Sequence, residues 1–188
     1  LAAGSSISSA NSYENNDKLE SWFSRVNYDF RDRYYLSASF RSDGSSRFHK
    51  DNRWGWFPSF SAGWRISEES FMKPVTWLDN LKLRASYGTL GNINNVGYYD
   101  YFELMSGNVD YNFDDKPVKG VVEAQIANKT LGWETVTLTD FGLDIDLFNS
   151  KLSMTADYYI KNTKDILLGY NVPVETGIWT RPVMNLAK

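Results

Sequence analysis

The sequence of 188 residues contains no cysteine and a single histidine. The absence of cysteine excludes a disulfide framework, a thiolate metal site and a cysteine nucleophile. With His49 as its one imidazole, the chain cannot assemble a histidine-based metal cluster, and we expect His49 to be an exposed loop imidazole rather than a member of a catalytic triad. Composition alone therefore excludes the classes of enzyme and metalloprotein that depend on these groups.

Long apolar runs and an excess of basic residues are also missing. No stretch approaches the roughly 18 uninterrupted apolar residues of a membrane-spanning helix. The formal net charge is -3 at pH 7, so the chain lacks the basic face that a nucleic-acid partner requires, and we expect no such partner. A β-barrel membrane protein is not excluded, because its strands alternate apolar and polar residues.

Aromatic residues, in contrast, are abundant at 16% of the chain. Such a composition is typical of β-rich proteins, because aromatic rings suit pleated surfaces and interfaces. Alternation with a period of two residues predicts about six strands. We also expect a helical turn within 67–79 and short strands near 98–104 and 121–124. The six main predicted strands are 21–30, 33–41, 57–66, 80–88, 135–148 and 151–161.

The connections between these strands alternate in length. Arg31-Asp32 and Asn149-Ser150 predict tight turns, whereas 42–55, 89–133 and 162–182 are long. In an up-and-down meander the short links lie at one end of the sheet and the long ones at the other. Transmembrane barrels show this asymmetry, with short periplasmic turns and long extracellular loops.

Two architectures fit the alternation, namely a soluble β-sandwich and a lipid-facing barrel. Three features favour the barrel. The strands have about the 9–11 residues that a tilted strand needs to cross a bilayer. Aromatic residues on the apolar face lie toward the strand ends, as in interfacial girdles. The opposite face carries charges within the strands, at Arg25, Arg84, Asp144 and Asp157, which a water-filled lumen tolerates.

Several long motifs resemble the SusC/RagA family of TonB-linked (TonB-dependent) outer-membrane transporters of Bacteroidetes. They are RDRYYLSASFRSDGSSRF (31–48), NRWGWFPSFSAGWRISEESFM (52–72), LDNLKLRASYGTLGN (78–92), LGWETV (131–136) and FGLDIDLFNSKLSMTADYYIKNTKDILL (141–168). The resemblance covers nearly the whole chain in the same order. It extends to the middle and late part of the family's barrel, but not to its signal peptide, TonB box, plug domain or closing strand.

The resemblance implies an all-β fold of antiparallel up-and-down strands, forming part of a transmembrane barrel of about 22 strands with an internal plug. Residues 1–188 would be a partial barrel domain of about six to seven strands. A bacterial barrel needs at least about eight strands to close, so we expect a segment rather than a self-standing membrane protein.

The family's function is the active import of oligosaccharides or peptides across the bacterial cell outer membrane with energy from TonB. The implied partners are outer-membrane lipid, a SusD-like surface lipoprotein, the TonB complex and the substrate. The alternative left by the residues themselves is a soluble β-sandwich carbohydrate-binding module. We expect no enzyme, because no catalytic constellation assembles.

The acidic pairs are the main candidates for other chemistry. Asp144 and Asp146 share a strand face about 7 Å apart, but they have no partner histidine and are best interpreted as solvated carboxylates. Asp114-Asp115 lacks the signature of a calcium loop. We therefore predict no catalytic, cofactor-binding or metal-binding residue.

Aromatic residues of the long loops are the candidate substrate-binding residues. Sugar rings present apolar C–H faces that stack on aromatic planes. The alternative is that these rings pack one loop against another or belong to the outer girdle. The candidates are Trp54, Tyr98, Tyr99, Tyr101 and Trp133, with Trp56 beside the first of them.

Overall fold

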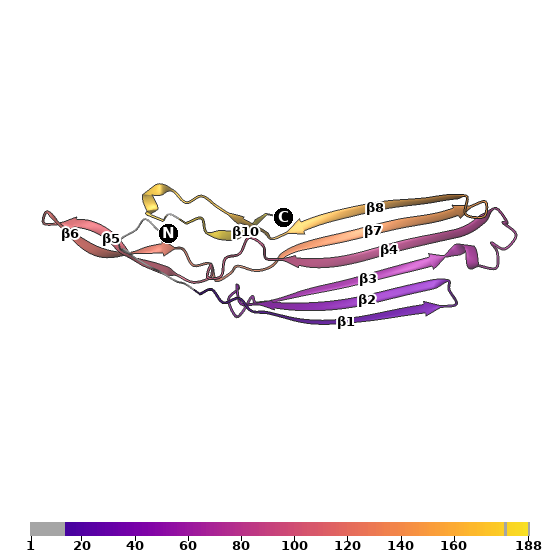
Figure 1. Cartoon of the computed structure of the whole chain (residues 1–188), viewed down its shortest axis with the longest axis horizontal. Coiled ribbons are helices and arrows are strands. Elements are labelled where there is room, and N and C mark those ends of the chain that lie inside the picture. Colours follow the sequence, from indigo (N-terminus) through magenta and orange to yellow (C-terminus); the bar gives the residue numbers. More distant parts are fainter. Residues whose placement is uncertain (1–13, 179, 188) are drawn as a thin grey trace, which may run out of the picture.

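The computed structural model describes residues 14–178 and 180–187. Within these residues the chain is built from antiparallel strands, with two short 3-10 turns and no α-helix. The long strands lie roughly along the long axis of the molecule (Figure 1). In order, the elements are β1 (Leu19–Phe30), β2 (Tyr34–Ser45), β3 (Trp54–Arg65), η1 (Ile66–Glu68), β4 (Leu78–Asn92), β5 (Leu104–Phe113), β6 (Lys116–Gln125), β7 (Glu134–Leu147), β8 (Leu152–Lys164), β9 (Ile166–Gly169), η2 (Val174–Thr176) and β10 (Val183–Ala187).

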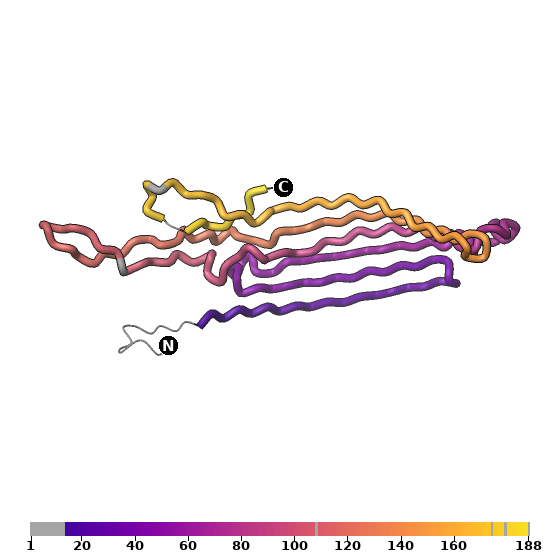
Figure 2. The backbone as a smooth tube through the Cα atoms, turned by 45° about the horizontal axis from the view of Figure 1, so that its top comes forward, coloured from indigo at the N-terminus to yellow at the C-terminus, as the bar shows by residue number. Residues whose placement is uncertain are grey.

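One six-stranded antiparallel sheet, in the order β1-β2-β3-β4-β7-β8, dominates the fold. Its strands lie side by side as a meander in Figure 2, and the β5–β6 hairpin extends from the link between β4 and β7. All six strands predicted from the alternation are present. They contain 12 to 15 residues each. Five of them are longer than predicted, because regular pairing continues past the predicted ends, whereas β7 has the predicted length, shifted by one residue.

The tight turns form as the sequence predicts, and all lie at one end of the sheet (Figure 1). Arg31 and Asp32 adopt φ of 55° and 53°, the left-handed geometry of the central residues of a type I′ turn. Three residues, 31–33, separate the paired Phe30 and Tyr34. The β7–β8 link is similar, since Phe148, Asn149 and Ser150 all have positive φ. The long loops gather at the other end, which confirms the predicted asymmetry.

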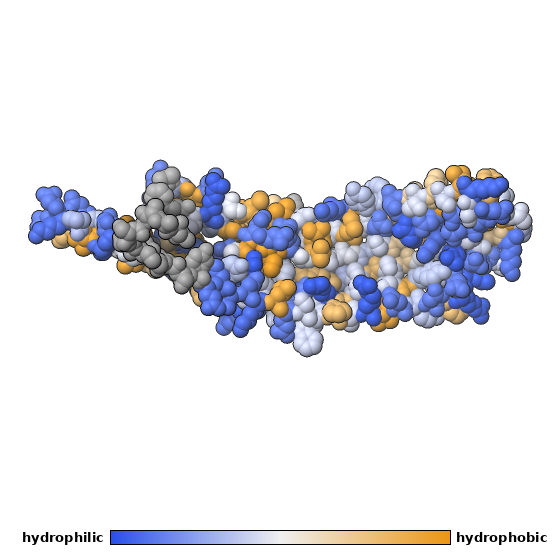
Figure 3. Space-filling view, in the orientation of Figure 1, coloured by the Kyte–Doolittle hydropathy of each residue, from blue (hydrophilic) through white to orange (hydrophobic). Residues whose placement is uncertain are grey.

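The apolar face of the sheet has no second layer on it in residues 14–178 and 180–187. The Phe60 side chain in the middle of β3 is 57% exposed, and Leu36 on β2 is 52% exposed. Apolar side chains are also visible at the surface in Figure 3. A soluble sandwich would bury these side chains under a facing sheet, so the sandwich prediction is not supported. Among the described residues no helix has the length and apolarity needed to cross a membrane.

Two further strand pairs lie outside the main sheet. The hairpin of β5 and β6 occupies the 89–133 loop, where the short strand predicted near 98–104 is wrong because residues 98–102 form turns. Asp114 and Asp115 have φ of 52° and 56°, so this acidic pair forms the two-residue turn of that hairpin. The 162–182 segment contains the end of β8 and the whole of β9, which pairs with β10.

The one hydrophobic core of the described residues lies at the loop end rather than in the sheet. Phe48, Leu131 and Leu167 are fully buried together with Val96. These residues come from four segments that are far apart in the sequence. Ile93, Trp133 and Val183 pack against them. The long loops therefore fold into one body, which we call the loop cluster.

Candidate functional site

The apolar face of the sheet is bounded by two groups of aromatic side chains. At the short-turn end, the rings of Tyr28, Phe30, Tyr34 and Trp64 stack in series with centroids 6.4 to 6.5 Å apart. Toward the loop end, Trp56 packs against Phe40 with 5.4 Å between ring centroids. We call these groups the inner and the outer aromatic row.

The spacing of the rows matches a membrane. Trp56 and Trp64 are about 26 Å apart along β3 at a rise of about 3.3 Å per residue. A strand tilt of about 40° reduces this to about 20 Å, close to the roughly 25 Å apolar band of outer-membrane barrels. Phe60 lies midway between the two tryptophans on the same face. The face is therefore long enough to meet the acyl region of a bilayer.

Glu69, in the link after η1, holds the inner aromatic row. Its carboxylate accepts hydrogen bonds from the Tyr34 hydroxyl at 2.6 Å and from the Trp64 indole N–H at 3.2 Å. Arg33 lies 3.4 Å from its second oxygen. The hydrogen bond from Tyr34 lowers the pKa of Glu69 below its usual value, and the hydrogen bond from Trp64 and the positive charge of Arg33 act in the same direction. The polar edges of the two rings are thus fixed toward the short-turn side.

We expect Glu69→Gln to lower the melting temperature of the full-length protein and to flatten its dependence on pH between 5 and 3. Because the folded-state pKa of Glu69 is depressed, its contribution is complete above the unfolded value of about 4.3 and is lost as pH falls through the folded value. Thermal denaturation at several pH values measures this. Glu68→Gln on the adjacent residue is the control. A pH profile in Glu69→Gln that matches the parent would contradict a stabilising role for the hydrogen bonds to Glu69.

The opposite face of the sheet is a polar wall with a compact ionic network. The Arg84 guanidinium donates to Asp144 at 2.8 and 3.1 Å and to Asp157 at 2.8 Å, and the Thr155 hydroxyl donates to Asp144 at 3.2 Å. A Cβ at Gly142 would come within 2.6 Å of this guanidinium, so the glycine lets Arg84 lie flat between its partners. Asp144 is therefore an ion-pair member rather than the free carboxylate that the sequence suggested.

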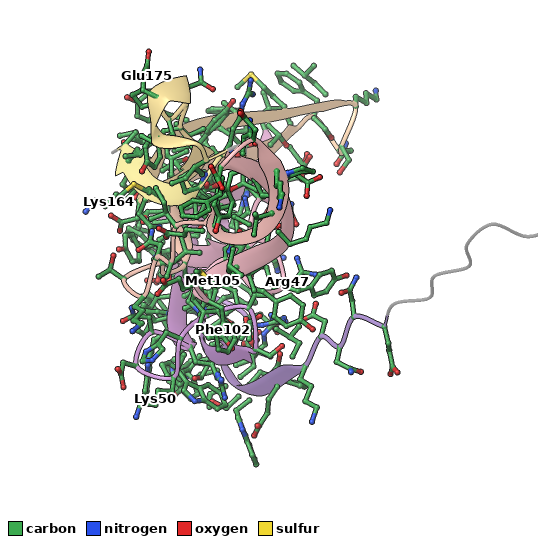
Figure 4. The ribbon with its side chains drawn as sticks, turned by 90° about the vertical axis from the view of Figure 1, so that its left-hand side faces the viewer. Arg47, Lys50, Phe102, Met105, Lys164 and Glu175 are labelled. Carbon is green, nitrogen blue, oxygen red and sulfur yellow. The ribbon has the colours of Figure 1, made fainter. Side chains whose placement is uncertain are left out.

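The predicted loop aromatics fall into two groups. Tyr98, Tyr99 and Tyr101 cluster in one turn with Phe102, and ring centroids there are 4.3 to 6.4 Å apart. Tyr98, Tyr99 and Phe102 are exposed. Figure 4 views this loop end, with Phe102 and Met105 near its centre and Lys50, Lys164 and Glu175 near its edge. These rings form an aromatic surface that a ligand approaching the loop end would meet.

Arg47 positions this aromatic turn. Its guanidinium lies 4.7 Å from the Tyr98 ring centroid, donates to the Val96 carbonyl at 2.9 Å and pairs with Asp17 at 2.7 Å. His49 contacts the Tyr101 ring edge-on at 6.1 Å. Sequence reasoning missed Phe102, Arg47 and His49 as parts of this arrangement. The aromatic run from Tyr98 to Phe102 was the available signal for Phe102, whereas the contacts of Arg47 are long-range.

The tryptophans lie elsewhere. Trp54 was expected in a loop but begins β3, because pairing continues to Gly44↔Trp54. Trp56 is 66% exposed on the apolar face, in the outer aromatic row. Trp133 packs between Phe48 and Phe57 at 5.3 and 5.5 Å, and its indole N–H donates to the Arg53 carbonyl. Trp54 and Trp133 line a shallow hollow with Asn52 and Asn185, separate from the tyrosine cluster.

Residues 14–178 and 180–187 contain no group of three or more His, Asp or Glu side chains that could hold a metal ion. The buried Glu134 carboxylate instead joins the loop cluster to the sheet. It accepts from the Asn92 amide at 2.9 Å and from the Leu167 backbone N–H at 3.0 Å. These hydrogen bonds give Glu134 a structural role.

Comparison with known proteins shows similarity to one protein family. The profile described as TonB dependent receptor-like, beta-barrel matches residues 2–181. A TonB-dependent receptor of Formosa agariphila is 40% identical over 159 residues, covering 85% of this chain and 15% of that protein. The TonB-dependent receptor SusC of Bacteroides thetaiotaomicron is 37% identical over 177 residues, covering 93% of this chain and 18% of that protein.

A solved structure agrees with the sequence relatives. The structure of the RagAB peptide transporter superposes with a TM-score of 0.75 at 33% identity, covering 90% of this chain and 18% of that one. The chain therefore spans 15% to 18% of the length of the relatives described here. Together these findings confirm the resemblance drawn from the motifs.

Proposed function

Because the chain belongs to the TonB-dependent receptor β-barrel family, we propose that it supplies barrel wall and extracellular loops to an outer-membrane transporter for active nutrient import. One observation carries this proposal. An uncovered apolar face, bounded by two aromatic rows at membrane spacing, backs onto a polar wall with an ionic network. Lipid on one side and a wet passage on the other account for both faces.

We propose that residues 1–188 are a portion of the barrel domain of a longer protein. The outer edges of β1 and β8 pair with no strand among the described residues. Unpaired backbone groups cost several kcal/mol each in hydrocarbon, so both edges require further strands. The 15% to 18% of the relatives' length that the chain spans supports the same conclusion, and a complete barrel would have about 22 strands.

The orientation follows from the loop lengths. The short turns would face the periplasm and the loop cluster the cell exterior. A SusD-like lipoprotein would then meet the loop cluster, and TonB would act from the opposite side. The relatives supporting these partners are named TonB-dependent receptors, and one structure is described as the RagAB peptide transporter. The family relatives also favour transport over catalysis.

The proposed substrates are oligosaccharides or peptides, received in part by the aromatic turn. In cells that carry the full-length protein, we expect Tyr99→Ala to weaken substrate binding by up to about tenfold. An aromatic contact is worth about 0.5–1.5 kcal/mol, and about 1.4 kcal/mol is tenfold in affinity. Uptake of labelled oligosaccharides and peptides, with and without a protonophore, measures this and identifies the substrate class.

The matched control is Trp56→Ala, which removes an exposed aromatic side chain from the outer aromatic row instead of the loop cluster. It should leave substrate affinity unchanged in the transporter that reaches the membrane. Equal affinity in Tyr99→Ala and the parent would contradict the role of the aromatic turn. Uptake that survives the protonophore would contradict active import itself.

A further inference from the structure

The main sheet is split at its loop end, between β3 and β4. Pairing of β3 with β4 ends at Ser59↔Gly88, although pairing of β3 with β2 and of β4 with β7 continues toward the loops. The Thr89 hydroxyl donates across the split to the Pro58 carbonyl at 3.1 Å. Farther toward the loops, no hydrogen bond joins the described residues of the two strands. We call this opening the seam.

The β3 side of the seam carries unpaired backbone groups. The Arg53 carbonyl accepts from the Ser45 N–H on β2 at 3.2 Å, whereas the Pro58 carbonyl faces β4. Since successive residues of a strand direct their backbone groups to opposite neighbours, the N–H and C=O groups of Trp54 and Trp56 point into the seam. No described residue forms a hydrogen bond with them there. An unpaired strand edge of this kind offers donors and acceptors to a ligand.

Aromatic side chains fill part of the seam and leave the rest open. A Cβ at Gly55 or Gly91 would clash with the Phe57 ring, so these glycines let the ring lie across the seam. Trp133 packs against Phe57 with 5.5 Å between ring centroids. The open part is a hollow of about 420 Å³, within the range of small-molecule sites. We call it the seam hollow. Its polar lining side chains are Asp51, Asn52, Thr130, Thr135, Asp165 and Asn185.

The loop cluster holds the rim of the seam hollow in place. The Asn185 amide donates to the carbonyls of Gly132 and Asp165 at 3.0 and 2.8 Å and accepts from the Gly132 N–H at 3.0 Å. The Asn52 amide donates to the Lys129 carbonyl at 3.0 Å. These bonds join three long loops around the hollow. A rim fixed before binding lowers the entropy that a ligand must spend on ordering it.

The charge of the seam hollow disfavours anionic ligands. Its lining contains two carboxylates, Asp51 and Asp165, and no lysine or arginine. Asp51 pairs with His49 at 3.1 Å, whereas the Asp165 carboxylate forms no ion pair with a described residue. Like charges brought together at a binding surface repel one another. The hollow therefore rejects a phosphorylated lipid headgroup, an acidic oligosaccharide and the carboxylate end of a peptide, but not a neutral sugar.

A neutral sugar also matches the other groups of the hollow. A hydroxyl both donates and accepts hydrogen bonds, so sugar hydroxyls can bond to the unpaired backbone groups and to the Asp165 carboxylate. The Trp54 ring lies flat on Gly44, because a Cβ at that glycine would be 3.0 Å from three of its ring atoms. Trp54 is 41% exposed, so the other face of its ring is open. That face can stack on the apolar C–H face of a sugar.

We propose that the seam hollow is a subsite for a neutral sugar unit of the transported substrate. This inference rests on the proposed function and deepens it, because it assigns the substrate to the oligosaccharides rather than the peptides. Trp54 supplies the stacking surface, Asp165 accepts from a sugar hydroxyl, and the β3 edge supplies further donors and acceptors. The seam hollow is separate from the aromatic turn, so the two surfaces hold different units of one oligosaccharide.

Binding measurements on the purified full-length transporter test the ligand class and the subsite. On an array of neutral, uronic-acid and phosphorylated glycans, we expect binding to neutral glycans. Calorimetric titration with the neutral glycan that binds most tightly then compares variants. Trp54→Ala should weaken binding about twofold to tenfold, and Trp54→Phe, which keeps an aromatic face, should weaken it less. Asp165→Asn should weaken it about fivefold, because a carboxylate is the stronger hydrogen-bond acceptor.

Two control variants match these substitutions. Asparagine tolerates the φ of 56° at Asp165, and Asp114→Asn makes the same change at a φ of 52° in the β5–β6 turn, outside the hollow. Trp56→Ala removes an indole that packs on Phe40 but keeps the backbone groups of the β3 edge. Both controls should bind the neutral glycan with the affinity of the parent.

The same measurements can overturn the proposal. Binding confined to acidic or phosphorylated glycans would do so, as would the absence of binding to any neutral glycan. Parent affinity in both Trp54→Ala and Asp165→Asn would show that the sugar binds elsewhere. Peptide binding that weakens in these two variants would make the hollow a peptide site instead. Each of these outcomes would leave protonophore-sensitive uptake, and so the proposed function, unaffected. Uptake that survives the protonophore would contradict the proposed function without changing the measured binding at the seam hollow.

Discussion

Replacing Phe60 by arginine is expected to prevent most of the full-length protein from assembling in the outer membrane. Phe60 is 57% exposed on the apolar face and lies midway between Trp56 and Trp64. In a barrel wall it would face the middle of the acyl region, where an arginine costs about 2–4 kcal/mol. That cost corresponds to a decrease of roughly 30-fold to 1000-fold in the folding equilibrium. The heat-modifiable, protease-resistant fraction in outer-membrane preparations measures this effect.

Ser59→Arg is the matched control, because Ser59 is the preceding residue of β3 and faces the polar wall, where its hydroxyl lies 2.6 Å from that of Ser39. The same charge placed there meets water and should permit assembly. If Phe60→Arg assembled as well as Ser59→Arg, the apolar face would not be in contact with lipid. The proposed function would then lose the observation on which it rests.

The six-stranded sheet could be predicted because each of its strands carries a local signal. Alternation in β2 and β8 is nearly uninterrupted, and each tight turn contains Asp32 or Asn149, residue types that adopt the positive φ observed there. The choice between barrel and sandwich needed more than alternation. The aromatic ends of strands and the charges on the opposite face supplied it, and the exposed apolar face agrees with them.

The β5–β6 hairpin was harder to predict, because its alternation is interrupted. The register shifts between Ser106 and Val109, so a period-two pattern cannot be followed through β5. Pro117 lies in β6 and weakens that signal further. Asp114-Asp115 carried the turn signal, but without two clear flanking strands it was considered as a metal ligand pair.

The candidate site could be predicted only where its residues carry a local sequence signal. The aromatic turn is contiguous in sequence, so Tyr98, Tyr99 and Tyr101 could be named together. The contacts that hold it are non-local, since Arg47 reaches back to Asp17 and forward to Val96. No periodicity marks such residues. The same limitation applied to the loop cluster, whose core residues are isolated apolar positions in polar loops.

We expect Phe48→Ala to unfold the loop cluster while the barrel stays assembled. Phe48 is fully buried and packs against Trp133 with 5.3 Å between ring centroids. Truncation of a buried phenylalanine costs about 3–5 kcal/mol, and this core is too small to compensate by repacking. Amide hydrogen exchange around Leu131 and Leu167 should therefore accelerate by between about a hundredfold and a few thousandfold. Hydrogen-exchange mass spectrometry of the full-length protein measures this.

Phe71→Ala provides the comparison, because Phe71 is 62% exposed in the link after η1 at the opposite end of the molecule. It should leave exchange in the loop cluster unchanged. Since Val96 lies in the same core and its carbonyl accepts from Arg47, Phe48→Ala should also weaken substrate binding through the aromatic turn. Normal exchange at Leu131 and Leu167 in Phe48→Ala would contradict this prediction and show that the loops are held together without this core.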